Sequence, residues 1–410
     1  MAPPSSLPDA KTIANACFDA YQELGGRCDG GLRDELAAFA QQFVDDGLLR
    51  PYFVSKLVPW ERFVRPPNEG HTAVADLLLC RAVAAALTTN YDTLVERRAS
   101  DYGAFFESAR DGDDANRTVS RHSPYLKLHG CSTRPLETVW TASQFDRDPI
   151  KKRLQSLQSW IAANLREKDL IFIGFWSDWS YLNSLLERVL NNVQPSSILI
   201  VSPADYGTLE CKARRLWRLI HASGARIQHM QMSGDQFLNE LRIAFSQVFV
   251  SRALKAGMAS FTNATGAACG DGWFQMANES ETLYAIRRNV EGVPRSAPAS
   301  LKRPPASEPF GCCHLLLKRA GALETGADYA LRGRTIRVIN GGGRDLESLR
   351  GTFAEEAPSL GAADLVIAAG ATNLGFHNSI VRSGREDDIV RPAVSGEWVT
   401  LEEARVVLEV

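Results

Sequence analysis

Short apolar runs alternate with segments of helical periodicity between residues 83 and 250, and this alternation strongly constrains the fold. The apolar runs have strand length and cover residues 83–88, 125–128, 169–174 and 197–202, and residues 226–230 are a candidate for a further strand. The segments between them, such as residues 150–166 and 181–190, repeat apolar residues at the spacing of one helix face. Strands that are apolar on both faces are typical of parallel sheets covered by helices. The sequence therefore predicts an α/β fold with a Rossmann-like, doubly wound parallel sheet in a domain over residues 1–250.

The remainder of the 410-residue chain has a different character. Residues 251–310 are rich in glycine and proline and predict a connector between domains. Residues 334–340 and 364–369 are strand-like and flank a helical segment at residues 345–356. Residues 398–410 predict a closing helix and strand. We therefore expect a smaller C-terminal α/β domain over residues 311–410.

Charge and hydropathy exclude two classes of protein. The 46 Lys and Arg residues against 48 Asp and Glu residues leave a net charge of −2, so no basic field over the whole chain attracts nucleic acid. Met1–Pro8 contains no basic region followed by an apolar run, and no stretch approaches the roughly eighteen apolar residues of a membrane span. We expect a cytoplasmic protein without a membrane partner.

Polar residues follow three of the predicted strands. Thr89, Asn90 and Asp92 follow the first, and His129 and Gly130 follow the second. Gly174, Ser177 and Asp178 follow the third. The carboxyl ends of parallel strands form the ligand crevice of such sheets, so we expect these residues at one edge. Histidine titrates near neutrality and can act there as a general base.

The order of these motifs resembles sirtuin-like domains over about residues 5–245. Thr88-Thr89-Asn90-Tyr91-Asp92 is similar to the family's threonine/glutamine–asparagine–x–aspartate motif, and Leu128-His129-Gly130 to its catalytic leucine–histidine–glycine. Thr138–Phe145, Gly174–Asp178 and Ile198–Pro203 follow in the family's order. The resemblance is to the bacterial branch that consumes NAD in antiphage defence.

This resemblance implies a role for each matching residue. Asn90 would position the nicotinamide ribose or the attacking water, Asp92 would orient the nicotinamide end, and His129 would be the general base. Such chemistry passes through an oxocarbenium-like ribosyl cation, as glycoside hydrolysis does. The remaining cofactor-binding residues implied are Thr89, Gly130, Gly174, Ser177, Asp178, Ser202 and Asp9.

The activity implied is NAD hydrolysis to nicotinamide and ADP-ribose, which would deplete NAD and abort infection when a partner activates the enzyme. A homo-oligomer is expected. The resemblance implies a HerA-like ATPase as partner, or another defence protein such as a short Argonaute. A non-catalytic scaffold that binds NAD or ADP-ribose is the alternative function, and a deacylase or ADP-ribosyltransferase is a third.

The sequence departs from the family pattern at two points. Its eight cysteines form no CxxC pair, so no zinc is expected and the zinc-free branch is favoured. The family also opens with a strand and a glycine-rich phosphate loop, whereas Ser5-Ser6-Leu7-Pro8-Asp9 matches only the end of that region. Without them the sheet lacks a central strand and the pyrophosphate lacks a backbone cradle. Either the true start lies upstream, or this chain is a degraded family member.

Several of these residues also have a structural interpretation. Asn90 and Asp92 could cap the following helix, and His71 could cap a helix or lie in the core. The basic run of Lys212 to Arg218 could be a solvated helix face. Two further motifs allow both interpretations: Asn340-Gly341-Gly342-Gly343 is either a tight turn or a second phosphate loop, and Cys312-Cys313-His314 is either core or part of a metal site.

Overall fold

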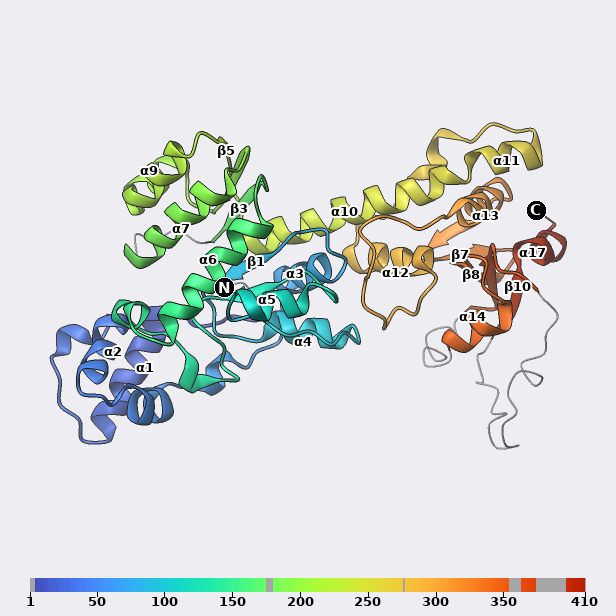
Figure 1. Ribbon diagram of the computed structural model, residues 1–410. Coiled ribbons are helices and arrows are strands. Elements are labelled where there is room, and N and C mark those ends of the chain that lie inside the picture. The colour runs from blue at the N-terminus through green and yellow to red at the C-terminus, as the bar shows by residue number, and fades with distance from the viewer. Residues whose placement is uncertain (1–3, 175–179, 276, 354–362, 374–395, 410) are drawn as a thin grey trace. The chain divides into compact units, whose positions relative to one another are not determined.

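The computed structural model describes residues 4–174, 180–275, 277–353, 363–373 and 396–409. The chain forms two compact units, Met1–Asn239 and Glu240–Val410. The boundary between the two units falls inside helix α10 (Gly234–Ala256). Figure 1 traces the elements of each unit.

The first unit contains five parallel strands in two sheets. Their bounds are β1 (Ala86–Thr88), β2 (Tyr125–Lys127), β3 (Leu170–Ile173), β4 (Ser197–Val201) and β5 (Arg226–Met230). Strands β1 and β2 pair with each other, while the other sheet has the order β3-β4-β5. The four apolar runs and the further candidate at residues 226–230 are therefore all strands with parallel pairing, and the predicted α/β class is confirmed.

Two details of the sheet differ from the prediction. The strands form two separate sheets among the described residues, where a single doubly wound sheet was expected. The first strand is also shorter than residues 83–88, because the amide groups of Ala82 and Val83 both donate to the carbonyl of Leu77 at the end of α3 (Glu69–Leu79). Because of this turn, the strand begins only at Ala86.

Helices follow each strand of the first unit and also precede β1. Their bounds are α1 (Ala10–Glu23), α2 (Leu36–Asp45), α4 (Leu94–Asp101), α5 (Gly112–Thr118), α6 (Ile150–Asn164), α7 (Ser180–Val193), α8 (Tyr206–Lys212) and α9 (Arg214–Ala222), with a π-helix at Leu49–Leu57. The N-terminal helices enclose an aromatic core around Phe39, Phe43 and Phe53. A second core contains Leu126 of β2, Leu157 of α6 and Val189 of α7.

The second unit is built on a mixed five-stranded sheet in the order β10-β9-β8-β7-β6. The bounds are β6 (Leu323–Thr325), β7 (Asp328–Leu331), β8 (Arg334–Asn340), β9 (Leu365–Ala369) and β10 (Glu397–Thr400). Strands β8, β9 and β10 are parallel, whereas β6, β7 and β8 are antiparallel neighbours joined by tight turns at Gly326 and Gly333. The antiparallel hairpin was not predicted, although glycine turns between short runs are its usual signal.

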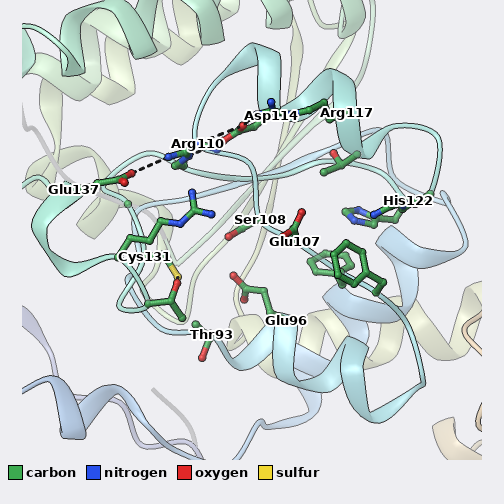
Figure 2. Close-up of a pocket in the computed structure, with 17 residues that line it drawn as sticks. Thr93, Glu96, Glu107, Ser108, Arg110, Asp114, Arg117, His122, Cys131 and Glu137 are labelled. Atoms are coloured by element: carbon green, nitrogen blue, oxygen red, sulfur yellow. Dashed lines mark hydrogen bonds and ion pairs between the residues drawn. The ribbon is translucent and has the colours of Figure 1, made fainter.

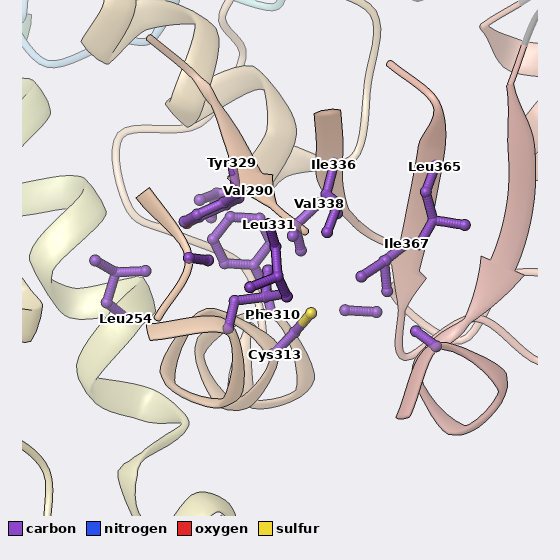
Figure 3. Packing of buried hydrophobic residues seen from close by; sticks show 14 of the residues in the cluster. Leu254, Val290, Phe310, Cys313, Tyr329, Leu331, Ile336, Val338, Leu365 and Ile367 are labelled. Carbon is purple, nitrogen blue, oxygen red and sulfur yellow. The ribbon is translucent and has the colours of Figure 1, made fainter. Parts of the chain in front are cut away.

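Helices α11 (Met258–Thr265), α12 (Ser280–Glu291), α13 (Glu308–Arg319), α14 (Leu346–Thr352) and α17 (Leu401–Leu408) complete this unit. The predicted connector over 251–310 therefore contains structure: Val290 of α12 packs with Phe310 and Ile336 in the main core of the unit (Figure 3). Glycine and proline shape the turns between these helices, while the buried apolar residues set where the helices pack. The second compact unit begins at Glu240.

Candidate active site

The loop after β1 carries three of the predicted residues. The backbone amide of Asn90 donates to Oγ1 of Thr88 at 3.1 Å, and the Asn90 side chain is partly exposed. Asp92 is only 2% exposed, and its Oδ1 accepts a hydrogen bond from the amide of Leu94 at 3.0 Å, where α4 begins. The N-cap of α4 is Thr93, so Asp92 bonds the first residue of the helix from just outside it and helps to position the loop that presents Asn90.

A buried lysine links this loop to β2. Lys127 is 1% exposed, and its Nζ lies 2.6 Å from Oε1 of Glu96 on α4. The same ammonium group donates to the backbone carbonyl of Asp92 and, at 3.3 Å, to Sγ of Cys131. A buried charge needs such partners to offset its lost hydration. Lys127 thus fixes the distance between the two strand-end loops.

His129 lies just beyond β2 and is 7% exposed. Burial lowers the pKa of His129 to about 4, against the opposing effect of a hydrogen bond with the backbone of Thr89. The rings of Tyr91 and Phe145 lie 6.0 and 6.2 Å from the imidazole. His129 is therefore neutral at pH 7, the state in which an imidazole nitrogen can accept a proton.

Gly130 allows a close approach that a side chain would prevent. Its φ is +89°, and a Cβ there would lie 3.2 Å from Cα of Thr138. The segment that passes so close is tied to the site: the amide of Val139 donates to the carbonyl of His129 at 2.9 Å, and the Tyr91 hydroxyl donates to the carbonyl of Val139 at 2.5 Å. Glycine is the residue that tolerates this backbone conformation.

The ends of β3 and β4 form a second group. Gly174 has φ +63°, with open space where a Cβ would lie, and its amide donates to the carbonyl of Val201 at 3.1 Å. Ser202 Oγ accepts a hydrogen bond from the amide of Ala204 at 3.3 Å. Ser177 and Asp178 lie outside the described residues.

The structure thus brings the predicted residues together in two sets. Asn90, Asp92 and His129 are joined through hydrogen bonds of their loops, including the amide of Ser132 to the carbonyl of Tyr91 at 2.8 Å. Gly174 and Ser202 are joined through the β3–β4 pairing. The two sets belong to different sheets within the described residues.

Asp9 has a local structural role. Its Oδ1 accepts a hydrogen bond from the amide of Thr12 at 2.8 Å, which makes it the N-cap of α1. Hydrogen bonds from Thr12 also hold the pKa of Asp9 below its ordinary value. The contact with a ligand predicted for Asp9 stays a prediction.

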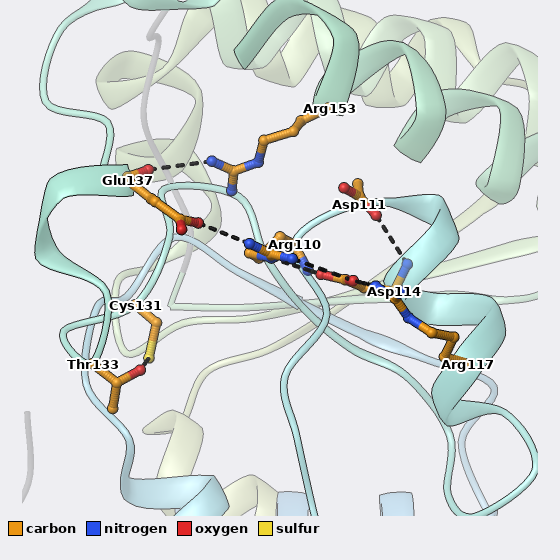
Figure 4. Close-up of polar contacts among 8 residues, drawn as sticks. All are labelled: Arg110, Asp111, Asp114, Arg117, Cys131, Thr133, Glu137 and Arg153. Carbon is orange, nitrogen blue, oxygen red and sulfur yellow. Dashed lines mark hydrogen bonds and ion pairs between the residues drawn. The ribbon is translucent and has the colours of Figure 1, made fainter. Parts of the chain in front are cut away.

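A charged cavity of about 500 Å³ lies beside the β2 loop and was not predicted (Figure 2). Gly130 and Cys131 line it, but Asn90, Asp92 and His129 do not. Arg110 contacts Asp114 at 2.7 Å and Glu137 at 2.9 Å at its rim (Figure 4). Burial would raise the pKa of Asp114, but hydrogen bonds from Arg110 and Arg117 lower it to about 2. The charged residues within Arg110–Asp114 are the feature of the sequence that could have indicated this cavity.

The remaining motifs have structural roles. His71 forms a capping box with Asn68 at the start of α3, and the side chains of the basic run, Lys212, Arg214, Arg215 and Arg218, are exposed. The glycines after Asn340 form a turn, with φ +58° at Gly342 and +76° at Gly343. His314 is buried in α13 and contacts the hydroxyl of Tyr329 at 2.6 Å and the carbonyl of Trp273 at 2.7 Å.

Within the part of the chain that the structure describes, no three His, Cys, Asp or Glu side chains gather as a metal site would require. Among the helices in the described ranges, none combines the length and apolarity needed to cross a bilayer.

Part of the chain is similar to a known protein family. No curated protein matches the chain. Residues 84–223 match the family model described as SIR2-like domain, a segment that contains β1 to β4 and the strand ends described above. That family includes NAD-dependent enzymes and implies NAD binding. The match supports a sirtuin-like protein with an NAD-related activity.

Proposed function

We propose that this protein is an NAD glycohydrolase that releases nicotinamide and ADP-ribose. The observation that carries the proposal is the joined pair of strand ends, where Asn90 and a neutral His129 lie on loops linked by the Thr89–His129 hydrogen bond. Both residues fall inside the segment that matches the SIR2-like family. Thr89 and Gly130 complete the same loops, and Gly174 and Ser202 lie at neighbouring strand ends of the other sheet.

The proposed reaction breaks the bond between C1′ of the ribose and the nicotinamide nitrogen. The electron pair of that bond returns to the pyridinium ring, so nicotinamide leaves neutral, and water adds to C1′ with loss of a proton. Asn90 would hold the ribose or the water, and His129 would accept the proton from a ribose hydroxyl or the water. Asp92 acts through the loop, since its carboxylate is engaged with the amide of Leu94. Ser177 and Asp178 are proposed on the adenosine side from the motif order alone.

The biological setting is part of the proposal. NAD depletion by an activated cytoplasmic enzyme would serve antiphage defence through abortive infection. A homo-oligomer, a HerA-like ATPase and a short Argonaute are the proposed partners, and each follows from the resemblance of the strand-end motifs. A zinc-free site is proposed on the cysteine spacing.

Single substitutions test the site. Asn90→Ala and His129→Ala should each reduce nicotinamide release at least about a hundredfold, the usual size of a lost acid–base or positioning group. His221→Ala, on the exposed surface of α9, is the matched control and should keep full activity. Nicotinamide and ADP-ribose are measured by chromatography, with thermal unfolding checked for each variant. Wild-type turnover retained in both site variants contradicts the assignment.

A non-catalytic scaffold is the second candidate, and one observation favours it. His129 is 7% exposed, and the described cavity beside it is lined by none of the three predicted catalytic side chains. A scaffold would bind NAD or ADP-ribose without releasing nicotinamide. Calorimetric titration with each ligand, run beside the turnover assay, separates the two functions.

A further inference from the structure

The charged cavity beside the loop after β2 lies apart from the predicted catalytic side chains. Gly130 and Cys131 line it, whereas Asn90, Asp92 and His129 do not. Its volume of about 500 Å³ falls within the range of roughly 300–1,000 Å³ that small-molecule sites occupy. The proposed hydrolysis therefore leaves a cavity of ligand size without a role.

Many of the charged side chains around the cavity are already paired with one another. Arg110 and Arg117 both contact Asp114. Arg110 also contacts Glu137 at 2.9 Å (Figure 4). Glu96 forms an ion pair with the buried lysine of β2. These contacts hold the walls of the cavity, because each of these charges has its counterpart within the protein.

Two other arginines that line the cavity have no such partner. Within the described residues, neither Arg121 nor Arg134 has a carboxylate at ion-pair distance or a hydrogen bond from its guanidinium group. The guanidinium carbon of Arg121 lies 4.8 Å from the ring centroid of Phe105. Because this contact uses the face of the guanidinium, the N–H groups in its plane stay available. Such planar groups bind phosphoryl oxygens through paired hydrogen bonds.

A third arginine beside the cavity adds to the positive charge there. Arg153 of α6 donates to the backbone carbonyl of Glu137 at 3.2 Å, and its Nε is buried without a hydrogen-bond partner among the described residues (Figure 4). Burial lowers the pKa of Arg153, and the positive charge of Arg110 lowers it further, although neighbouring carboxylates act in the opposite direction. A bound anion would offset this mutual repulsion of the arginines.

A carboxylate and an aromatic ring line the same cavity. Glu107 has no ion pair within the part of the chain that the structure describes, and an ionised carboxylate accepts hydrogen bonds from hydroxyl groups (Figure 2). Phe105 is 64% exposed although it is a large apolar side chain. An exposed aromatic ring of this kind can stack with a planar ring of a ligand. The lining thus offers partners for an anion, for hydroxyl groups and for a planar ring.

We propose that this cavity binds a mononucleotide-like ligand, which joins a phosphoryl group, sugar hydroxyl groups and a planar base in one molecule. Arg121 and Arg134 bind the phosphoryl oxygens. Glu107 accepts hydrogen bonds from the sugar hydroxyl groups, and Phe105 stacks with the base. This site goes beyond the proposed NAD hydrolysis, because none of these four residues is assigned to that reaction.

Calorimetric titration of the 410-residue chain with AMP, adenosine and inorganic phosphate tests the proposal. We expect AMP to bind at least about tenfold more tightly than either fragment, because it engages the arginines and the aromatic ring together. Arg121→Ser and Arg134→Ser should each weaken AMP binding at least about tenfold, the usual contribution of a hydrogen bond to a charged group. Arg218→Ser removes an exposed arginine of α9 that does not line the cavity, and it should leave AMP binding unchanged.

AMP is a fragment of NAD, so hydrogen exchange is measured to locate the bound molecule. Bound AMP should slow exchange at residues 105–108 and 131–134. The proposal is overturned if AMP does not bind at millimolar concentration, or if both arginine variants bind it as the wild type does. Protection confined to residues 170–174 and 202 would also overturn it, because AMP would then occupy the proposed NAD site. None of these results depends on nicotinamide release, so failure of the hydrolase proposal is separately recognisable.

Discussion

The indole of Trp140 stacks on the ring of Tyr91, with ring centroids 4.7 Å apart and planes 15° apart. Tyr91 belongs to the loop after β1, and Trp140 follows the segment that covers Gly130. The indole Nε1 donates to Oγ1 of Thr138 at 2.7 Å, so the stack and the hydrogen bond fix one conformation of the loop around His129.

Replacing this indole should destabilise the first unit. Trp140→Ala removes a 6% exposed aromatic side chain and should lower the free energy of unfolding by about 3–5 kcal/mol. Trp140→Phe keeps a ring against Tyr91 but loses the hydrogen bond to Thr138, so its cost should be smaller. Urea denaturation measures both variants, and equal losses would show that stacking contributes little.

The buried ion pair between Lys127 and Glu96 predicts strong coupling. Lys127→Met leaves the Glu96 carboxylate, which is 14% exposed, without its cation and should cost about 3–5 kcal/mol. Adding Glu96→Gln should recover part of that loss, because the uncompensated charge is then gone. A double-mutant cycle by urea denaturation gives the coupling energy, and additive single effects would contradict the prediction.

Alanine substitutions at Gly130 and at Gly25 form a matched pair, because both glycines have a positive φ. Gly130→Ala places a Cβ at φ +89° and 3.2 Å from Cα of Thr138, whereas Gly25→Ala at φ +83° meets nothing within 4 Å. Both should cost about 1–2 kcal/mol for the backbone conformation. Gly130→Ala should cost more, because the Thr138 segment must also move. Thermal unfolding of the two variants measures the difference, and equal costs would show that the segment yields freely.

His129 predicts a dependence of stability on pH. Its pKa is about 4 in the folded protein against 6.5 ordinarily, so the unfolded chain binds the proton more readily. Stability should be full above pH 6.5, fall as the pH drops toward 4, and lose about 3 kcal/mol from this group in total. His129→Gln should flatten the profile over this window relative to His221→Ala. Urea denaturation at a series of pH values tests this, and parallel profiles would assign the acid sensitivity to other groups.

Much of the secondary structure could be predicted, because strands and helices follow from the pattern of apolar residues along the chain. Apolar runs such as residues 169–174 and 197–202 mark strands through their length and their continuous apolar character. The helix over residues 150–164 follows from the spacing of Leu154, Leu157 and Ile161. The helices within residues 251–310 were missed, because burial of Val290 and Phe310 against a distant sheet outweighs local glycine and proline content.

For the candidate site, too, some features could be predicted from the local sequence and others depend on the tertiary structure. The sequence alone determined which residue types follow each strand, since strand ends and polar residues are adjacent in the chain. Only the tertiary structure decided that Asp92 bonds the start of a helix and that Lys127 links two loops. It also decided that, among the described residues, β1 and β2 form one sheet and β3, β4 and β5 another. Those relationships depend on which groups pack together and lose their water, and residues distant in sequence meet only when the chain has folded.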